Sequence, residues 1–219
     1  MTVLSTDTIR MRLDEQNPEK RLVISPILDL DGQAKGGQAA IDVRLGFYFC
    51  LVTASSFGAI SEFVERGVQP KSFAGLYRRE YVPFGSNIVI HPHQFLLGQT
   101  LEYIRLPSDL MAYVVGRSTW GRLGLIVATA VGIHPGFAGS LTFELRNLGE
   151  TPLTLYPGQT LAQLFIHSVV GRDGAPATEV SARMQYAGTV DMVPQRISSG
   201  KTYDTLAKLI ARFEKASRV

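Results

Sequence analysis

The chain has 219 residues, of which 45% are hydrophobic and 19% are charged, and its formal net charge is +3. This length and apolar content allow the core of one domain and exclude an intrinsically disordered chain. The single cysteine, Cys50, excludes an internal disulfide and a cysteine-rich metal site. Lysines and arginines are spread along the sequence, which favours a small anionic ligand over a nucleic acid as the binding partner.

The sequence shows neither a signal peptide nor a membrane-spanning segment. Residues 1–7 lack the basic and apolar regions of a signal peptide. The longest apolar stretch, around residues 125–133, is much shorter than the ~20 residues that cross a bilayer. We therefore expect a cytoplasmic protein that has no membrane partner.

The N-terminal part of the chain predicts one short helix and one loop. Residues 5–13 form the helix, with Ser5 or one of the next two residues as its N-cap and with Ile9 and Leu13 on one face. Residues 29–38 are polar and contain glycine, which is typical of a loop.

From residue 39 onward the pattern is typical of β-strands. Apolar runs of strand length alternate with Pro and Gly, and they predict strands at residues 41–52, 87–90, 95–106, 111–115, 125–133, 140–146, 152–155 and 160–170. Many short strands at close spacing indicate a β-sandwich, a jelly roll or a barrel-like fold. Residues 55–81 have weak periodicity and no assignment, and residues 203–218 predict a closing helix.

Residues 116–124 gather groups that bind anions. Arg117 and Arg122 supply guanidinium groups, and Ser118 and Thr119 supply hydroxyls. Arginine forks match phosphate oxygens in pairs, and glycine lets backbone N–H groups approach closely. The hypothesis is a phosphate-binding segment, and the alternative is a hairpin turn with solvated arginines.

Glu144 interrupts an apolar strand. In residues 140–146 the alternation places Leu141, Phe143 and Leu145 on one face and Glu144 on the other. One interpretation is a solvated strand face with a glutamate–arginine surface pair. The other is a desolvated carboxylate that faces a cleft and acts as general base towards water.

The histidines give no clear metal signal. His91 and His93 flank a proline, but no cysteine or carboxylate stands at ligand spacing, so we predict a polar turn and no metal site. His134 precedes Pro135 and Gly136, in a turn ahead of the Glu144 strand.

With these residues in view, the chain resembles the dCTP deaminase family of the dUTPase-like superfamily over most of residues 4–170. The resemblance is carried by residues 40–46, 95–102, 107–110, 116–124 and 132–139, and by residues 156–159 with Gln163. It implies a mainly β fold, a distorted jelly roll or β-clip of dUTPase-like type with short N-terminal and C-terminal helices. It also implies one domain over residues 1–219, with a helical segment at 1–20, a β core at 39–170 and a closing segment and helix at 171–219.

The resemblance further implies a zinc-independent hydrolase that converts dCTP to dUTP and ammonia. The enzyme would be a homotrimer with active sites between subunits, and Mg²⁺ would arrive with the nucleotide triphosphate. Two alternatives stay open: a bifunctional dCTP deaminase/dUTPase or a dUTPase, and a nucleotide-binding paralogue without catalysis.

Five residues receive roles near the reacting groups and the phosphates from the resemblance. Glu144 would be the general base that activates the water attacking cytosine C4. Arg122 would bind phosphate beside the catalytic water, together with Ser118 and Thr119. Arg117 would contribute from an adjacent subunit.

The remaining implied substrate contacts are more dispersed. Thr129 and Ala130 would form the wall that reads the pyrimidine edge, and Gln163 and Tyr186 match later binding segments. His134 stands where the family has an aspartate that contacts the sugar 3′-hydroxyl and, in dUTPases, activates the water that attacks phosphate. We therefore expect His134 to disfavour dUTP hydrolysis while permitting deamination.

Overall fold

The computed structural model of the protein describes residues 2–52, 77–128 and 132–170. Apart from Tyr77, these residues belong to one compact unit that comprises residues 1–52 and 78–192. No helix within them is long and apolar enough to cross a membrane. The predicted segment at 171–219, with its helix at 203–218, lies outside the described residues.

The N-terminal helix is confirmed as α1 (Thr6–Leu13). Ser5 is its N-cap, because the Ser5 hydroxyl accepts a hydrogen bond of 3.2 Å from the Thr8 backbone N–H. Ile9 is fully buried and anchors the helix to the core.

The polar loop at residues 29–38 contains one helical turn that the sequence did not predict, α2 (Leu30–Gln33). Asp29 caps this turn, since its side chain accepts a hydrogen bond of 3.0 Å from the Gly32 N–H. Four residues are too few to produce helical periodicity, so only the cap could have indicated this turn.

Seven of the eight predicted strands are present among the described residues, the eighth is divided in two, and three further short strands join them. The strands are β1 (Thr2–Val3), β2 (Val23–Ser25), β3 (Ile41–Val52), β4 (Tyr77–Tyr81), β5 (Ile88–Ile90), β6 (Phe95–Arg105), β7 (Leu110–Gly116), β8 (Leu125–Val127), β9 (Gly132–Ile133), β10 (Ala138–Asn147), β11 (Leu153–Leu155) and β12 (Thr160–Ser168). The prediction of one strand at 125–133 is wrong, because that run divides into β8 and β9, which pair with different neighbours.

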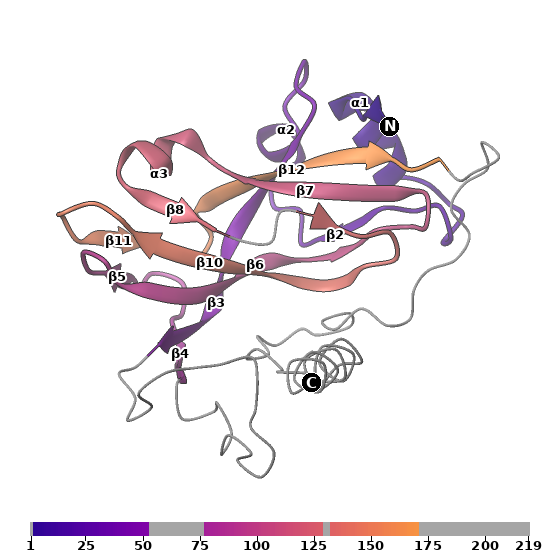
Figure 1. Ribbon diagram of the computed structural model, residues 1–219. Helices are drawn as coiled ribbons and strands as arrows, with labels where there is room; N and C mark the ends of the chain where they lie inside the picture. The colour runs from indigo at the N-terminus through magenta and orange to yellow at the C-terminus, as the bar shows by residue number, and fades with distance from the viewer. Residues whose placement is uncertain (1, 53–76, 129–131, 171–219) are drawn as a thin grey trace, which may run out of the picture. The chain divides into compact units, whose positions relative to one another are not determined.

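Ten strands form one sheet whose main path runs β8-β10-β6-β3-β12-β7-β9, while β11 and β5 pair separately. Figure 1 shows β7 beside β12 and β10 beside β6. β8 and β9 end the path on opposite sides, yet residues 127 and 132 are only five steps apart along the chain. Five extended residues span at most ~18 Å, so the sheet must curl until its two edges approach each other. The mainly β, jelly-roll-like prediction is confirmed.

The alternation predicted around Glu144 is confirmed in β10. Leu141, Phe143 and Leu145 are buried in the core, and Glu144 between them is half-buried on the opposite face. Burying the apolar side of a central strand stabilises the sheet by roughly 2 kcal/mol per large side chain. The core thus fixes the register that holds Glu144 on the other face.

A paired arginine and aspartate connect α1 to the turn between β6 and β7. Arg12 donates two hydrogen bonds of 2.8 Å, one to each carboxylate oxygen of Asp109. The Arg12 guanidinium lowers the pKa of Asp109 below its usual range. Both side chains are largely shielded, with 20% and 24% of their surfaces exposed.

We expect Asp109→Asn to reduce the free energy of unfolding by about 1–2 kcal/mol at pH 7, because a two-pronged charged pair is lost. A carboxyl with a lowered folded pKa stabilises the fold above its unfolded pKa of ~3.9, and that stabilisation disappears as the pH falls through the folded value. Urea unfolding at pH 7 and pH 3 measures this. A difference between parent and variant that does not shrink at pH 3 contradicts the assignment.

Candidate functional site

Residues 116–124 fold as a helical turn, α3 (Ser118–Arg122), so the alternative of a hairpin turn is wrong. Arg117 is the N-cap residue, and its backbone N–H donates a hydrogen bond of 3.0 Å to the Leu161 carbonyl. Gly124 ends the segment at φ 91°, where a Cβ would lie 2.7 Å from the Gly149 nitrogen. Only glycine fits that position, so α3 has a fixed connection to the rest of the sheet.

An open cleft of about 430 Å³ lies beside α3. Charged side chains of both signs line it: Asp29, Lys35, Asp42, Arg44 and Arg117. The remaining lining residues are uncharged: Gly32, Gln33, Thr119, Trp120 and Thr160. The cleft therefore joins the α2 region, β3, α3 and the start of β12.

Asp42 on β3 organises one side of this cleft. Its side chain is only 5% exposed, and one carboxylate oxygen pairs with Nη1 of Arg117. The other oxygen accepts a hydrogen bond of 2.8 Å from Nε2 of Gln163. The predicted residues Arg117 and Gln163 are thus brought together by a residue that the sequence analysis placed in a strand and gave no role.

A buried carboxylate lies behind the cleft. Glu102 on β6 is fully buried, and it accepts hydrogen bonds from the Arg44 backbone N–H at 2.9 Å and from Nε2 of Gln33 at 3.3 Å. Nη1 of Arg44 lies 3.6 Å from Oε1 of Glu102. Burial raises the pKa of Glu102 to about 7, although the hydrogen bonds and the arginine oppose that rise.

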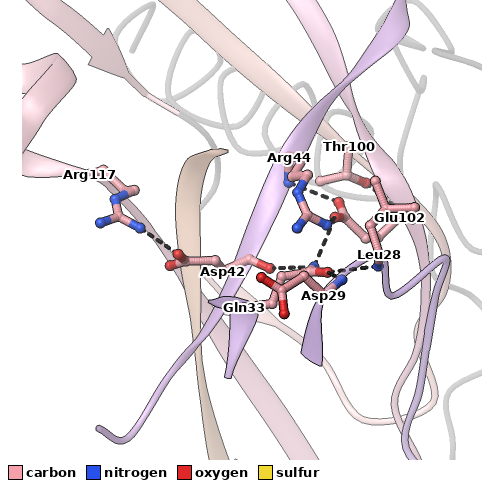
Figure 2. Close-up of polar contacts among 8 residues, drawn as sticks. All are labelled: Leu28, Asp29, Gln33, Asp42, Arg44, Thr100, Glu102 and Arg117. Carbon is pink, nitrogen blue, oxygen red and sulfur yellow. Dashed lines mark hydrogen bonds and ion pairs between the residues drawn. The ribbon is translucent and has the colours of Figure 1, made fainter. Parts of the chain in front are cut away.

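Gln33 connects the two carboxylate-bearing strands. Besides Glu102, its Nε2 donates to the Asp42 backbone carbonyl at 3.2 Å, and its Oε1 accepts from the Leu28 N–H at 3.0 Å. Figure 2 shows Gln33 between Asp42 and Glu102, with the Arg117 guanidinium pointing at Asp42. Gln33 is 2% exposed, so its amide is held in one position by these contacts.

Trp120 fixes α3 against β12. The indole N–H donates a hydrogen bond of 3.0 Å to the Thr160 carbonyl. Trp120 is also the one tryptophan of the chain, and it lines the cleft. Its fluorescence therefore reports on this site alone.

The other predicted residues of α3 lie outside the cleft. Ser118 and Arg122 are exposed and are not lining residues, whereas Thr119 is exposed and lines it. The structure therefore brings Arg117, Thr119 and Gln163 together and leaves Ser118 and Arg122 facing solvent. A ligand that contacts all of them would have to extend along α3.

Glu144 on β10 and His134, which directly follows β9, lie outside the cleft. The Glu144 carbonyl accepts a hydrogen bond of 2.8 Å from the Ala128 N–H, directly after the end of β8. His134 is exposed and begins a turn in which the Phe137 N–H donates to its carbonyl at 3.2 Å. Neither residue lines the cleft within one chain. The predicted substrate residues Thr129, Ala130 and Tyr186 lie outside the described residues.

The polar turn predicted around His91 and His93 is confirmed. The Gln94 N–H donates to the His91 carbonyl at 3.1 Å, and His93 adopts a φ of 64°. Over residues 2–52, 77–128 and 132–170, no group of three or more His, Cys, Asp or Glu side chains is arranged to hold a metal ion.

Comparison with known proteins identifies the family. A family model described as dCTP deaminase-like matches residues 3–169. The dCTP deaminase of Natronomonas pharaonis is 38% identical over 163 residues, which cover 74% of this chain and 78% of that protein. The dUMP-forming dCTP deaminase of Methanobrevibacter smithii is 34% identical over 173 residues, which cover 77% of this chain and 81% of that protein.

A solved structure shares the fold. The 2′-deoxycytidine 5′-triphosphate deaminase from Agrobacterium tumefaciens gives a TM-score of 0.54 at 20% identity, covering 75% of this chain. This chain spans 47% of the length of that solved chain. The matched β core and the sequence relatives agree, and the chain belongs to the dCTP deaminase-like family.

Proposed function

We propose that the protein is a nucleotide deaminase that hydrolyses the C4 amine of dCTP to give dUTP and ammonia. The observation that carries this proposal is the family match over residues 3–169. Two relatives of at least 34% identity are named dCTP deaminases, and both cover about three quarters of the chain. The cleft beside α3, with three cationic side chains against two carboxylates, is suited to an anionic nucleotide.

In the proposed reaction, Glu144 supplies the proton transfers. Its carboxylate takes a proton from a water molecule, and the water oxygen forms a bond to cytosine C4. Glu144 delivers that proton to N3, then takes the remaining proton from the new C4 hydroxyl and passes it to the amine. The C4–N bond breaks, the C4 carbonyl forms, and ammonia leaves. Water supplies the oxygen of the uracil product, and no zinc takes part.

The triphosphate would be bound by residues of α3 and its N-cap. Within the described residues, Asp42 takes up one of the five N–H donors of the Arg117 guanidinium, which leaves others for phosphate. Ser118, Thr119 and Arg122 add hydroxyls and a second guanidinium. Mg²⁺ would arrive as part of the substrate, bound to the phosphates.

We also propose that the enzyme is a cytoplasmic homotrimer with shared active sites. Glu144 does not line the cleft of its own chain, which supports a site completed by a neighbouring subunit. Thr129, Ala130, His134 and Tyr186 keep their proposed roles at the nucleoside and at the closing segment.

A second candidate function is the combined deaminase and diphosphohydrolase reaction, because relatives such as that of Methanobrevibacter smithii are named dUMP-forming. His134 favours deamination alone. It stands where the resemblance places the aspartate that activates water for attack on phosphate.

The test is incubation of the purified protein with dCTP and separately with dUTP, with independent assays for ammonia and pyrophosphate. We expect ammonia from dCTP and no pyrophosphate from either nucleotide. Stoichiometric pyrophosphate from dUTP would establish the second candidate. Nucleotide binding without either product would identify a paralogue that has lost catalysis.

A further inference from the structure

Arg44 is held in the cleft wall by a weak contact. Its backbone N–H binds Glu102 directly, but Nη1 of its guanidinium lies 3.6 Å from Oε1 of Glu102 and has no hydrogen-bond partner among the described residues. The side chain is 12% exposed and lines the cleft. The guanidinium of Arg44 is thus a largely buried cation that interacts with the Glu102 carboxylate at ion-pair distance but does not form a hydrogen bond to it through Nη1.

The other nearby carboxylate is already occupied. Asp42 and Arg44 are two residues apart on β3, so their side chains emerge on the same side of the strand. Both oxygens of Asp42 are engaged, one by Arg117 and one by Gln163. The charge of Arg44 is therefore balanced by Glu102 or by a ligand in the cleft.

The balance of charge in the cleft depends on Glu102. Three cations line the cleft, namely Lys35, Arg44 and Arg117, against the two anions Asp29 and Asp42. An ionised Glu102 behind Arg44 cancels the single excess positive charge. A neutral Glu102 leaves that charge facing the cleft, where the low dielectric of the protein strengthens its attraction for an anion.

We propose that Glu102 is a positioning residue whose proton controls how strongly Arg44 attracts a polyphosphate into the cleft. When Glu102 is ionised, Arg44 stays paired behind the cleft surface. When Glu102 takes up a proton, Arg44 is released towards the ligand and the cleft binds polyphosphate more tightly. This inference deepens the proposed function, since it rests on a polyphosphate nucleotide as the occupant of the cleft.

The surroundings of Glu102 place this change in the neutral pH range. Burial raises its pKa to about 7. Arg44 from β3 is the charged group that contacts it within the described chain, and the neutral Gln33 contacts it from α2. Lys35 and Asp42 line the cleft. A bound polyanion favours the protonated form further, because it competes with Glu102 for Arg44.

The test measures binding of inorganic tripolyphosphate at pH 6 and pH 8, by Trp120 fluorescence and by calorimetry. We expect the parent protein to bind about as tightly as Glu102→Gln at pH 6 and about tenfold more weakly than Glu102→Gln at pH 8. Glu102→Gln keeps the size of the side chain and removes its charge. It should bind as tightly at pH 8 as the protonated parent form. The ratio of the two affinities, parent to Glu102→Gln, is compared at each pH, because the titration of tripolyphosphate itself cancels in that ratio.

Two further variants keep the test decisive. Arg44→Met removes the cation that Glu102 controls and should also abolish the extra pH dependence, even if Glu102→Gln folds poorly. Asp109→Asn makes the same carboxylate-to-amide change in a charged pair outside the cleft. Its tripolyphosphate affinity should change between pH 6 and pH 8 as that of the parent protein does.

The outcomes separate this inference from the proposed function. An equal pH dependence in the parent protein, Glu102→Gln and Arg44→Met would overturn the inference, and so would a parent protein that binds no tripolyphosphate at either pH. The binding assay contains no cytosine, so the proton link can hold in a protein that fails to deaminate dCTP. Conversely, deamination with no proton link would leave the proposed function intact and reject the role of Glu102.

Discussion

Glu144→Gln is expected to slow dCTP deamination by about 100-fold or more, the usual scale for loss of a positioned acid–base group. Glutamine has nearly the same shape, but its amide cannot take a proton from water. The backbone of residue 144 pairs with β6 and with Ala128, and those hydrogen bonds do not involve the side chain. The fold and the binding of nucleotide should therefore survive.

Ammonia release under saturating dCTP measures the turnover of this variant, and Trp120 fluorescence measures its nucleotide binding. Glu150→Gln is the matched control, because Glu150 is 88% exposed and its ion pair with His93 is long at 3.7 Å. The control should deaminate at the parent rate. A Glu144→Gln protein that also deaminates at the parent rate would exclude the proposed general base.

Long strands were predictable because their alternation extends over many residues. β3 begins and ends at the predicted residues, Ile41 and Val52, and β10 differs from its prediction by two residues at the start and one at the end. β1 has two residues and β2 has three, too few for a period to emerge. Their pairing with β12 and β6 creates them, so they depend on tertiary structure.

The side-chain composition of residues 116–124 supports a prediction of anion binding, but it does not predict their local structure. Arginines, hydroxyls and glycines in nine residues indicate anion binding whatever the backbone does. The helical turn α3 depends on contacts with distant residues, such as the Arg117 N–H to the Leu161 carbonyl and the Trp120 indole to the Thr160 carbonyl. Neither contact leaves a local pattern in the sequence.

The partners within the cleft were also beyond local sequence reasoning. Asp42 meets Arg117 across 75 residues and Gln163 across 121 residues. The one available signal was a carboxylate between the apolar residues Ile41 and Val43 in a strand. A charged side chain in such a run is buried only when it is paired, so a search for its cation would have been justified.

Loss of the Arg117 side chain, the cation that pairs with Asp42, should also have a large effect on catalysis. Arg117→Ala should lower kcat/KM for dCTP by about 100-fold, mostly through a higher KM, because a guanidinium that binds phosphate contributes about 1.5–3 kcal/mol. The loss has a second source. Asp42, which is 5% exposed, would lie beside the triphosphate without its arginine partner, and within the described part of the chain its remaining side-chain donor would be Gln163.

Adding Asp42→Asn to Arg117→Ala should therefore recover part of the loss, about tenfold in kcat/KM, because the uncompensated carboxylate is removed. Asp42→Asn alone should cost less than Arg117→Ala, since the guanidinium is still present although less well oriented. Steady-state kinetics of the parent, both single variants and the double variant give the coupling between the two side chains. Additive effects of the two substitutions would mean that Asp42 does not position Arg117 for phosphate. The ion pair would then stabilise the contact between β3 and α3 and would not contribute to the affinity for nucleotide.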